Sequence, residues 1–271
     1  MHTSCHPALV RARSTIAAAL LAIAILPWPV GTAQPSTLRV GVYEARGVGA
    51  SALDGAMAAF GASADITARR ITPADVRAGA LDELDVVLFT GGRGSIQGQL
   101  LGEAGRERVR RFVRGGGGYV GICAGAYLAI QGPAEFHKVG IVAAQNLTGD
   151  LWRRGIAPAR VAPSDGSAAR ELHYANGPLL ARAEVAGLAP FVTLATFDAD
   201  VYWEAHGTRP GEMPGTPAVV AARYGRGRIV LFSPNPTLEP AHPELLVGAA
   251  RWTHRDGAVP SSLRWRDVFG P

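Results

Sequence analysis

Cys123 is the residue of this sequence best placed to act as a nucleophile. It stands in Gly121-Ile122-Cys123-Ala124-Gly125, with small residues on both sides, where a strand is expected to give way to a helix. A sharp turn of this kind holds a nucleophile in strained geometry, and larger neighbours would clash. The N-terminus of the helix would lower the pKa of the thiol. The local sequence therefore predicts a reactive cysteine, although composition alone favours a buried, inert one.

Backbone N–H groups near this cysteine can stabilise a developing oxyanion. The N–H of Ala124 follows the sulfur directly, and a second donor is expected from Gly91-Gly92. Glycines at that position allow the main chain to approach a substrate closely. Together they would form an oxyanion hole.

The elements that must position these groups alternate between strand-like and helix-like segments. The apolar patterns predict strands over 38–43, 66–71, 85–90 and 119–122, a strand pair over 218–224 and 228–232, and helices over 51–60, 103–114, 124–130 and 244–253. The middle of the chain, 136–197, reads as several short strands and loops. We predict an α/β fold, a flavodoxin-like three-layer sandwich with a mostly parallel central sheet, with the site at the carboxyl edge around Cys123.

The first 33 residues have the three parts of a signal peptide. Arg11 and Arg13 form a basic start, 16–26 is an unbroken apolar run, and small residues precede the Ala33-Gln34 bond. The run is shorter than the roughly 20 residues of a membrane-spanning helix, so an uncleaved anchor is the weaker alternative. We therefore expect a single domain over 34–271, exported to the periplasm or the outside of a bacterial cell, without a later membrane span.

Charge and cysteine count narrow the possible functions. The chain has 271 residues and a net charge of +5, and the two arginines of the leader reduce the net charge of the remainder to +3. So small an excess does not indicate nucleic-acid binding. Cys123 is the only cysteine after the leader, so 34–271 can form no intrachain disulfide.

Two longer segments carry a family resemblance. Residues 85–93 read D-V-V-L-F-T-G-G-R, and 114–128 read R-G-G-G-G-Y-V-G-I-C-A-G-A-Y-L. They resemble the biotin–protein-ligase N-terminal-domain-like family of the class I glutamine-amidotransferase-like superfamily. The resemblance extends from about Leu38 to Trp252, through H-Y-A-N-G-P at 173–178. It implies a glutamine-amidotransferase-like fold, and it implies oxyanion or substrate contacts at Gly91, Gly92, Arg93, Ala124 and Asn176.

The chain departs from this family where the catalytic base should be. The family usually reads S-P-H-P-E after the last strand, whereas this chain has Asn235 and Thr237 at the histidine and glutamate positions. Asn235 can form hydrogen bonds but cannot take a proton near neutral pH. His242, near the start of the closing helix, is the first candidate for a substitute base. His173 and His206 are the alternatives, and each of the three is more often a surface or packing residue.

Two functions stay open on these residues. The first is a thiol-dependent hydrolase or amidase-like enzyme acting on a small C–N substrate; the second is a non-catalytic protein that binds a small molecule in the retained pocket. The histidines show no metal-ligand spacing and the glycine patterns lack the context of a dinucleotide site, so we expect no metal and no cofactor. An imidazole close to the Cys123 sulfur would favour the enzyme.

Overall fold

The computed structural model describes residues 1–3, 37–147, 153–255 and 257–270. The chain divides by its contacts into residues 1–34 and 35–271, and the second unit holds all the helices and strands described here. The predicted signal peptide lies almost entirely outside the described residues.

One half of the central sheet is parallel. Its order is β2-β1-β3-β4-β11, and all four neighbouring pairs run in the same direction. The strands are β1 (Leu38–Tyr43), β2 (Ile66–Ile71), β3 (Val86–Phe89), β4 (Gly118–Ile122) and β11 (Gly227–Phe232). Since these strands run in one direction, their carboxyl ends meet at a single edge, which is where the site was expected.

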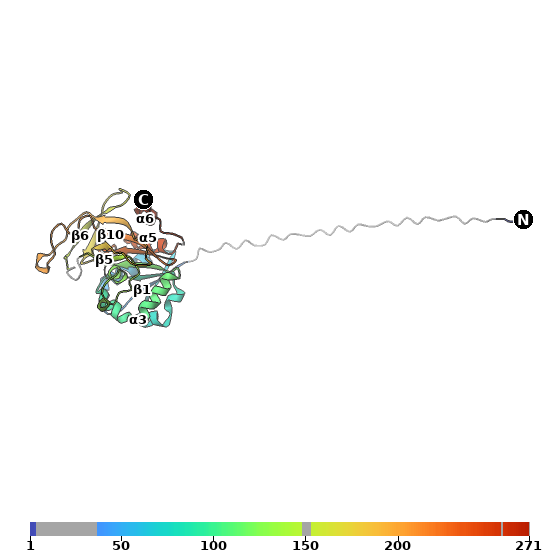
Figure 1. Ribbon diagram of the computed structural model, residues 1–271, viewed down its shortest axis with the longest axis horizontal. Helices are drawn as coiled ribbons and strands as arrows, with labels where there is room; N and C mark the ends of the chain where they lie inside the picture. The colour runs from blue at the N-terminus through green and yellow to red at the C-terminus, as the bar shows by residue number, and fades with distance from the viewer. Residues whose placement is uncertain (4–36, 148–152, 256, 271) are drawn as a thin grey trace. The chain divides into compact units, whose positions relative to one another are not determined.

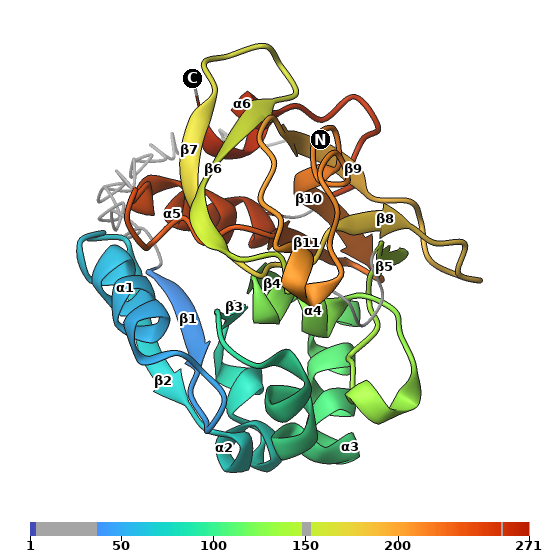
Figure 2. The same ribbon diagram turned by 90° about the vertical axis from the view of Figure 1, so that its left-hand side faces the viewer.

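Helices cover both faces of this half. The helices are α1 (Ala50–Gly61), α2 (Pro73–Ala78), α3 (Gly94–Arg114), α4 (Ala124–Ala129) and α5 (Pro243–Thr253). Alternate residues of β3 point to opposite faces: Val86 and Leu88 share a buried cluster with α1 and α5, whereas Val87 and Phe89 share another with α3 and α4. The result is a three-layer sandwich, and Figure 2 shows α1 beside β1, with α2 and α3 grouped together.

The other half of the sheet is antiparallel. Beyond β11 the order continues β10-β9-β6-β7, and every pair in this part is antiparallel. The strands are β6 (Ile156–Pro163), β7 (Arg170–Ala175), β9 (Val192–Phe197) and β10 (Pro217–Tyr224), with a separate ribbon of β5 (Ala144–Asn146) and β8 (Leu180–Arg182). Helix α6 (Trp265–Phe269) follows α5, and three short 3-10 turns lie at Ala80–Glu83, Ala134–Phe136 and Glu204–His206. Figure 1 shows β6 and β10 on the opposite side of this unit from α3.

The edge strand β7 returns to the parallel half. His173 forms an antiparallel bridge with Asn235, which lies just after β11. Close by, a Cβ added at Gly177 would overlap the carbonyl oxygen of Ser233, so the two segments are in direct contact. The antiparallel half therefore contributes a wall to the carboxyl edge of the parallel strands.

The α/β class and the sandwich predicted from the sequence are confirmed. The antiparallel extension is more regular than the short strands and loops expected for 136–197, and α2 and α6 were not expected. The helix predicted over 103–114 is the second part of α3, which is interrupted at Gly102 with φ of 65°. No helix in the part of the chain that the structure describes is long and apolar enough to cross a membrane.

Candidate functional site

Cys123 occupies the sharp turn between β4 and α4. Its backbone has φ of 50° and ψ of −102°, a conformation that a non-glycine residue adopts only under strain. The glycines on either side are required: a Cβ on Gly121 would lie 2.7 Å from the carbonyl oxygen of Gly125, and a Cβ on Gly125 would overlap the carbonyl oxygen of Phe89. The predicted elbow geometry is therefore present.

The thiol of Cys123 is nearly buried. The residue is 8% exposed, and its sulfur lies 3.5 Å from the carbonyl oxygen of Ala175, to which the thiol can donate. Burial raises the pKa of Cys123 to about 11, while hydrogen bonds from the backbone N–H groups of Gly92 and Ala124 oppose this rise. The lowered pKa expected from the sequence is wrong, because removal from water outweighs the donors.

Gly92 and Ala124 are the two residues whose N–H groups reach the sulfur. Gly92 has φ of 137°, and a Cβ there would overlap the carbonyl oxygen of Gly47, so only glycine allows this approach. Two loops are held together here by a bridge between Val48 and Gly92 and by a 3.0 Å hydrogen bond from the N–H of Gly49 to Gly91. These contacts fix two donors beside the sulfur.

A cavity of about 250 Å³ opens onto Cys123. Its walls come from the start of α1, the loop after β3, the end of β7 and the segment after β11. The residues that concern the chemistry are Gly49, Ser51, Ala52, Gly91, Gly92, Cys123, His173, Ala175 and Asn235. The structure thus brings a histidine and the cysteine to one cavity.

His173 has a defined tautomer. Its Nδ1 lies 3.0 Å from the carbonyl oxygen of Glu239, which can only accept a hydrogen bond. In the neutral imidazole Nδ1 therefore carries the proton, and Nε2 has a free lone pair. Such an arrangement, with one nitrogen anchored and the other free to accept, is what a general base requires.

Asn235 lines the same cavity, but the hydrogen bonds of its side chain are not those of a catalytic base. It is 4% exposed, and its Oδ1 accepts hydrogen bonds from the N–H of Thr237 at 2.8 Å and from the Thr237 hydroxyl at 2.9 Å. Because a main-chain N–H can only donate, this contact fixes the orientation of the amide. The Nδ2 of Asn235 therefore points away from Thr237.

The other predicted site residues lie elsewhere. His242 is at the N-terminus of α5, where its Nδ1 lies 3.2 Å from Glu244, and it does not line the cavity of Cys123. Asn176 has φ of 53° and accepts a 2.8 Å hydrogen bond from the N–H of Gly155; it lines a separate cavity. Arg93 is exposed at the start of α3.

His173, not His242, is the histidine that the structure places with the cysteine. His206 packs edge-on against Trp203, with the ring centroids 4.1 Å apart, and lines no part of this cavity. In the sequence His173 is separated from Cys123 by 50 positions, and only the bridge to Asn235 brings it to the site. In the sequence, only its position inside the H-Y-A-N-G-P segment indicated that His173 belongs to the site.

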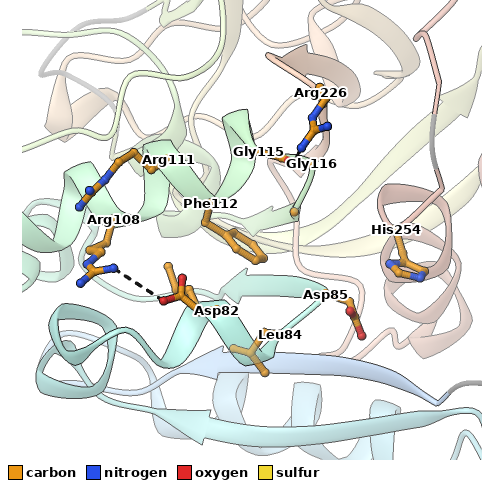
Figure 3. Close-up of a pocket in the computed structure, with 12 residues that line it drawn as sticks. Asp82, Leu84, Asp85, Arg108, Arg111, Phe112, Gly115, Gly116, Arg226 and His254 are labelled. Carbon is orange, nitrogen blue, oxygen red and sulfur yellow. Dashed lines mark hydrogen bonds and ion pairs between the residues drawn. The ribbon is translucent and has the colours of Figure 1, made fainter.

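A larger cavity, of about 680 Å³, lies at the opposite, amino-terminal edge of the strands (Figure 3). Its two acids each face an arginine: Asp82 lies 3.8 Å from Arg108, and Asp85 is bound by Arg39 at 2.7 Å. Phe112 lies in the middle of this open cavity (Figure 3). No nucleophile lines it, and the described residues contain no group of three side chains able to hold a metal ion. The smaller cavity is therefore the candidate site.

Comparisons with known proteins agree with this fold. Residues 76–145 match the family model described as "Biotin-protein ligase, N terminal". A solved structure described as a glutamine amidotransferase is 21% identical, with a TM-score of 0.56, over 80% of this chain and 99% of that one.

Two further solved structures are more distantly similar. PurLQS from Thermotoga maritima is 13% identical over 74% of this chain and 88% of that one, with a TM-score of 0.46. Cytoplasmic Protein STM1381 from Salmonella typhimurium LT2 is 13% identical over 72% and 87%, with a TM-score of 0.45. No curated protein sequence matches the chain significantly. The resemblance read from the sequence is confirmed: residues 76–145 match the biotin-protein ligase N-terminal family model, and the fold is similar to that of a glutamine amidotransferase.

Proposed function

We propose that this protein is a thiol-dependent hydrolase of small C–N substrates, with Cys123 as nucleophile and His173 as base. The observation that carries the proposal is that His173 lines the cavity of Cys123, with its Nδ1 held by the carbonyl oxygen of Glu239. The anchoring carbonyl takes the orienting role that a carboxylate plays in other cysteine and serine hydrolases.

In the first step the Nε2 of His173 accepts the proton of the thiol. The sulfur attacks the carbonyl carbon of the substrate, and the carbonyl oxygen becomes an oxyanion held by the N–H groups of Gly92 and Ala124. When this intermediate collapses, the C–N bond breaks and the imidazolium gives its proton to the leaving amine. The products of this step are ammonia or an amine and a thioester on Cys123.

In the second step water hydrolyses the thioester. His173 takes a proton from the water, the hydroxide adds to the thioester carbonyl, and the C–S bond breaks. The proton on His173 returns to the sulfur, so that the thiol is restored and a carboxylic acid leaves. A neutral resting thiol is compatible with this cycle, because the proton moves to the base only when substrate is bound.

A second function, binding without turnover, is favoured by a different observation. Burial raises the pKa of Cys123 to about 11, so the thiol is protonated at neutral pH in the free protein. A pocket that has lost the usual base and keeps a protonated thiol suits a ligand that is held and released unchanged.

Ammonia release from a panel of small primary amides distinguishes the hydrolase from the binding protein. We expect Cys123→Ala to abolish release and His173→Gln to lower it by about 10²–10⁴-fold, as for loss of a general base. His242→Gln is the matched control, because this histidine lies near the same edge but outside the cavity, and it should leave the rate unchanged. Amides that bind without turnover, or hydrolysis that survives Cys123→Ala, would exclude the hydrolase.

A further inference from the structure

We propose that the larger cavity, at the amino-terminal edge of the strands, is a second ligand site that binds small organic phosphates through Arg111, Arg226 and Phe112. Its volume of about 680 Å³ is within the range of small-molecule sites. The ligand class is a phosphate group attached to a flat apolar group. Because this cavity lies at the opposite edge of the sheet from Cys123, the proposal does not depend on the hydrolase reaction.

The charges that line this cavity do not cancel. The carboxylates of Asp82 and Asp85 are each paired with an arginine, at 3.8 and 2.7 Å. Arg111 and Arg226 also line the cavity, and neither has a carboxylate partner among the described residues. Two positive charges are therefore left over. A phosphate monoester carries a charge of about −2 at neutral pH and accepts several hydrogen bonds, so it matches them.

Arg226 is held at the cavity by two hydrogen bonds. It lies in the turn between β10 and β11, and its main-chain N–H donates to the carbonyl oxygen of Arg114 at 3.0 Å, which fixes the turn against the end of α3. Its guanidinium donates to the carbonyl oxygen of Gly115 at 2.6 Å. This contact uses one of the five N–H groups of the guanidinium and leaves the others for a ligand. Because the side chain is already positioned, less conformational entropy is lost on binding.

The arginines of α3 alone would have a simpler explanation. The exposed face of an amphipathic helix carries charged residues, and Arg111, in the last turn, is also favoured by the helix dipole. Neither reason applies to Arg226, which comes from another element and lines the same cavity. Figure 3 shows Arg111 and Arg226 on one side of Phe112 and the carboxylates of Asp82 and Asp85 on the other. The cavity therefore has a positive side built from two separate elements.

The main-chain N–H groups of the three glycines that line the cavity are already used. Those of Gly115, Gly116 and Gly117 each donate to a carbonyl oxygen in the last turn of α3. An anion in this cavity would therefore be held by side chains and not by the loop. Substitution of Arg111 or Arg226 is then a direct test of the site.

Phe112 gives the cavity an apolar centre. Its ring is half-buried and packs against Gly117, where an added Cβ would overlap the ring. Leu84 also lines the cavity. Aromatic rings in contact attract each other beyond the effect of the apolar area they bury. The arrangement therefore favours a phosphate that carries an aromatic group over inorganic phosphate.

Titration with phenyl phosphate, followed in ¹H–¹⁵N spectra, tests the site. We expect the main-chain signals of Gly115, Gly116, Gly117 and Arg226 to shift, with a dissociation constant of about 1 mM or below. Inorganic phosphate should bind roughly threefold to tenfold more weakly, because it lacks the aromatic group. Cys123→Ala should bind phenyl phosphate as the wild type does, so a failed ammonia assay would reject the hydrolase alone.

Matched variants locate the binding. Arg111→Gln and Arg226→Gln should each weaken the binding of phenyl phosphate by roughly tenfold, as for loss of a charged hydrogen bond; both arginines are exposed, so the variants should fold. Phe112→Leu should lower the affinity for phenyl phosphate to that for inorganic phosphate. Arg223→Gln is the control and should bind normally. Arg223 is exposed on the same hairpin and its guanidinium also donates to a carbonyl oxygen, that of Gly225 at 2.7 Å, but it does not line the cavity.

Two results would overturn the proposal. One is the absence of shifts with phenyl phosphate up to about 10 mM; the other is equal affinity in Arg111→Gln, Arg226→Gln and Arg223→Gln. Sedimentation with vesicles of phosphatidylglycerol and phosphatidylcholine tests the other source of phosphate groups. If vesicles bind through Arg226 and phenyl phosphate does not bind, the arginines form a membrane-docking surface and the small-molecule site is rejected. Binding of phenyl phosphate that depends on both arginines supports the site whether or not vesicles bind.

Discussion

The main-chain N–H of Asn235 donates a 2.7 Å hydrogen bond to the carbonyl oxygen of His173. Residues opposite each other in an antiparallel bridge project their side chains to the same side. The bond therefore explains why His173 and Asn235 line one cavity, although they are 62 positions apart in the chain. Asn235, where the family resemblance would place a histidine, is thus paired directly with the residue that we propose as the base.

The alkylation rate of Cys123 should depend steeply on pH. With a pKa raised to about 11 by burial, the thiolate fraction at neutral pH is far smaller than for a free thiol of pKa about 8.5. Iodoacetamide labelling of the folded protein should therefore be slower than that of a model thiol and should rise up to and beyond pH 10. A midpoint below about 8.5 would contradict the burial seen here.

The thiol of Cys123 also makes the stability of the fold depend on pH. Because the folded pKa lies above the unfolded one, the unfolded thiol ionises first as pH rises, and stability present below about pH 8.5 is lost between that value and the folded pKa. Between pH 8 and 10, the free energy of unfolding measured in urea should fall by about 2 kcal/mol more for the wild type than for Cys123→Ala. Parallel curves for the two proteins would argue against a buried thiol.

The sequence predicted the elbow and its donors but not the electrostatics around the thiol. The glycines beside Cys123 and the pair Gly91-Gly92 are visible as local patterns, since sterics at a sharp turn depend on nearby residues alone. The pKa depends on how much water reaches the sulfur, which is decided by β7 and by Ala175. The pairing of that edge strand is a long-range contact, and no local pattern records it. For the same reason His242, close to Asn235 in the sequence, looked a better base than His173.

Glutamine hydrolysis through the usual histidine–glutamate pair should be absent, because Asn235 cannot act as a base and Thr237 cannot orient one, so any turnover of glutamine should depend on His173. The double change Asn235→His with Thr237→Glu places the usual pair at these positions, and the new imidazole would line the cavity of Cys123. If the usual catalytic residues were simply lost, we expect slow acyl-enzyme formation from glutamine, detected by mass spectrometry. The single change Asn235→Ala is the control, and it should form this adduct no faster than the wild type.

Gly125→Ala should destabilise the fold strongly. A Cβ at this position would overlap the carbonyl oxygen of Phe89, which belongs to a central strand and cannot move freely. We expect a loss of roughly 3 kcal/mol or more in chemical unfolding. Gly61→Ala is the matched control, because nothing lies within 4 Å of the added methyl group at the end of α1. It should be neutral or stabilise by up to about 1 kcal/mol.

The attachment of α6 should weaken in acid. Asp165 accepts hydrogen bonds from the N–H of Arg266 at 2.9 Å and from Ser167, and these contacts hold the pKa of Asp165 well below its usual range. The stabilisation is therefore present above the unfolded pKa of about 3.9 and is lost as pH falls below it. Asp165→Asn should cost roughly 1–3 kcal/mol at neutral pH and should reduce the acid sensitivity. Equal acid sensitivity in the variant would argue against this role.

We propose that the protein is exported and cleaved near Ala33-Gln34. Intact-mass analysis of the protein from its native host should find an N-terminus at or close to Gln34. Replacing Arg11 and Arg13 by glutamate should reduce export, because the basic start of a signal peptide would be lost. A mature chain that still contains Arg11 would rule the cleavage out.

The strained turn and the edge strand belong to different parts of the folding unit. Strand β7 can separate from β6 and Asn235 by a local opening that leaves β4 and the turn at Cys123 intact, since edge strands exchange their amide hydrogens at lower cost than central ones. A chain opened in this way keeps its nucleophile but loses its proton acceptor. Molecules opened in this way are then inactive. Hydrogen exchange at the main-chain amide of Asn235, which donates to His173, would report the fraction of molecules that are competent at any moment.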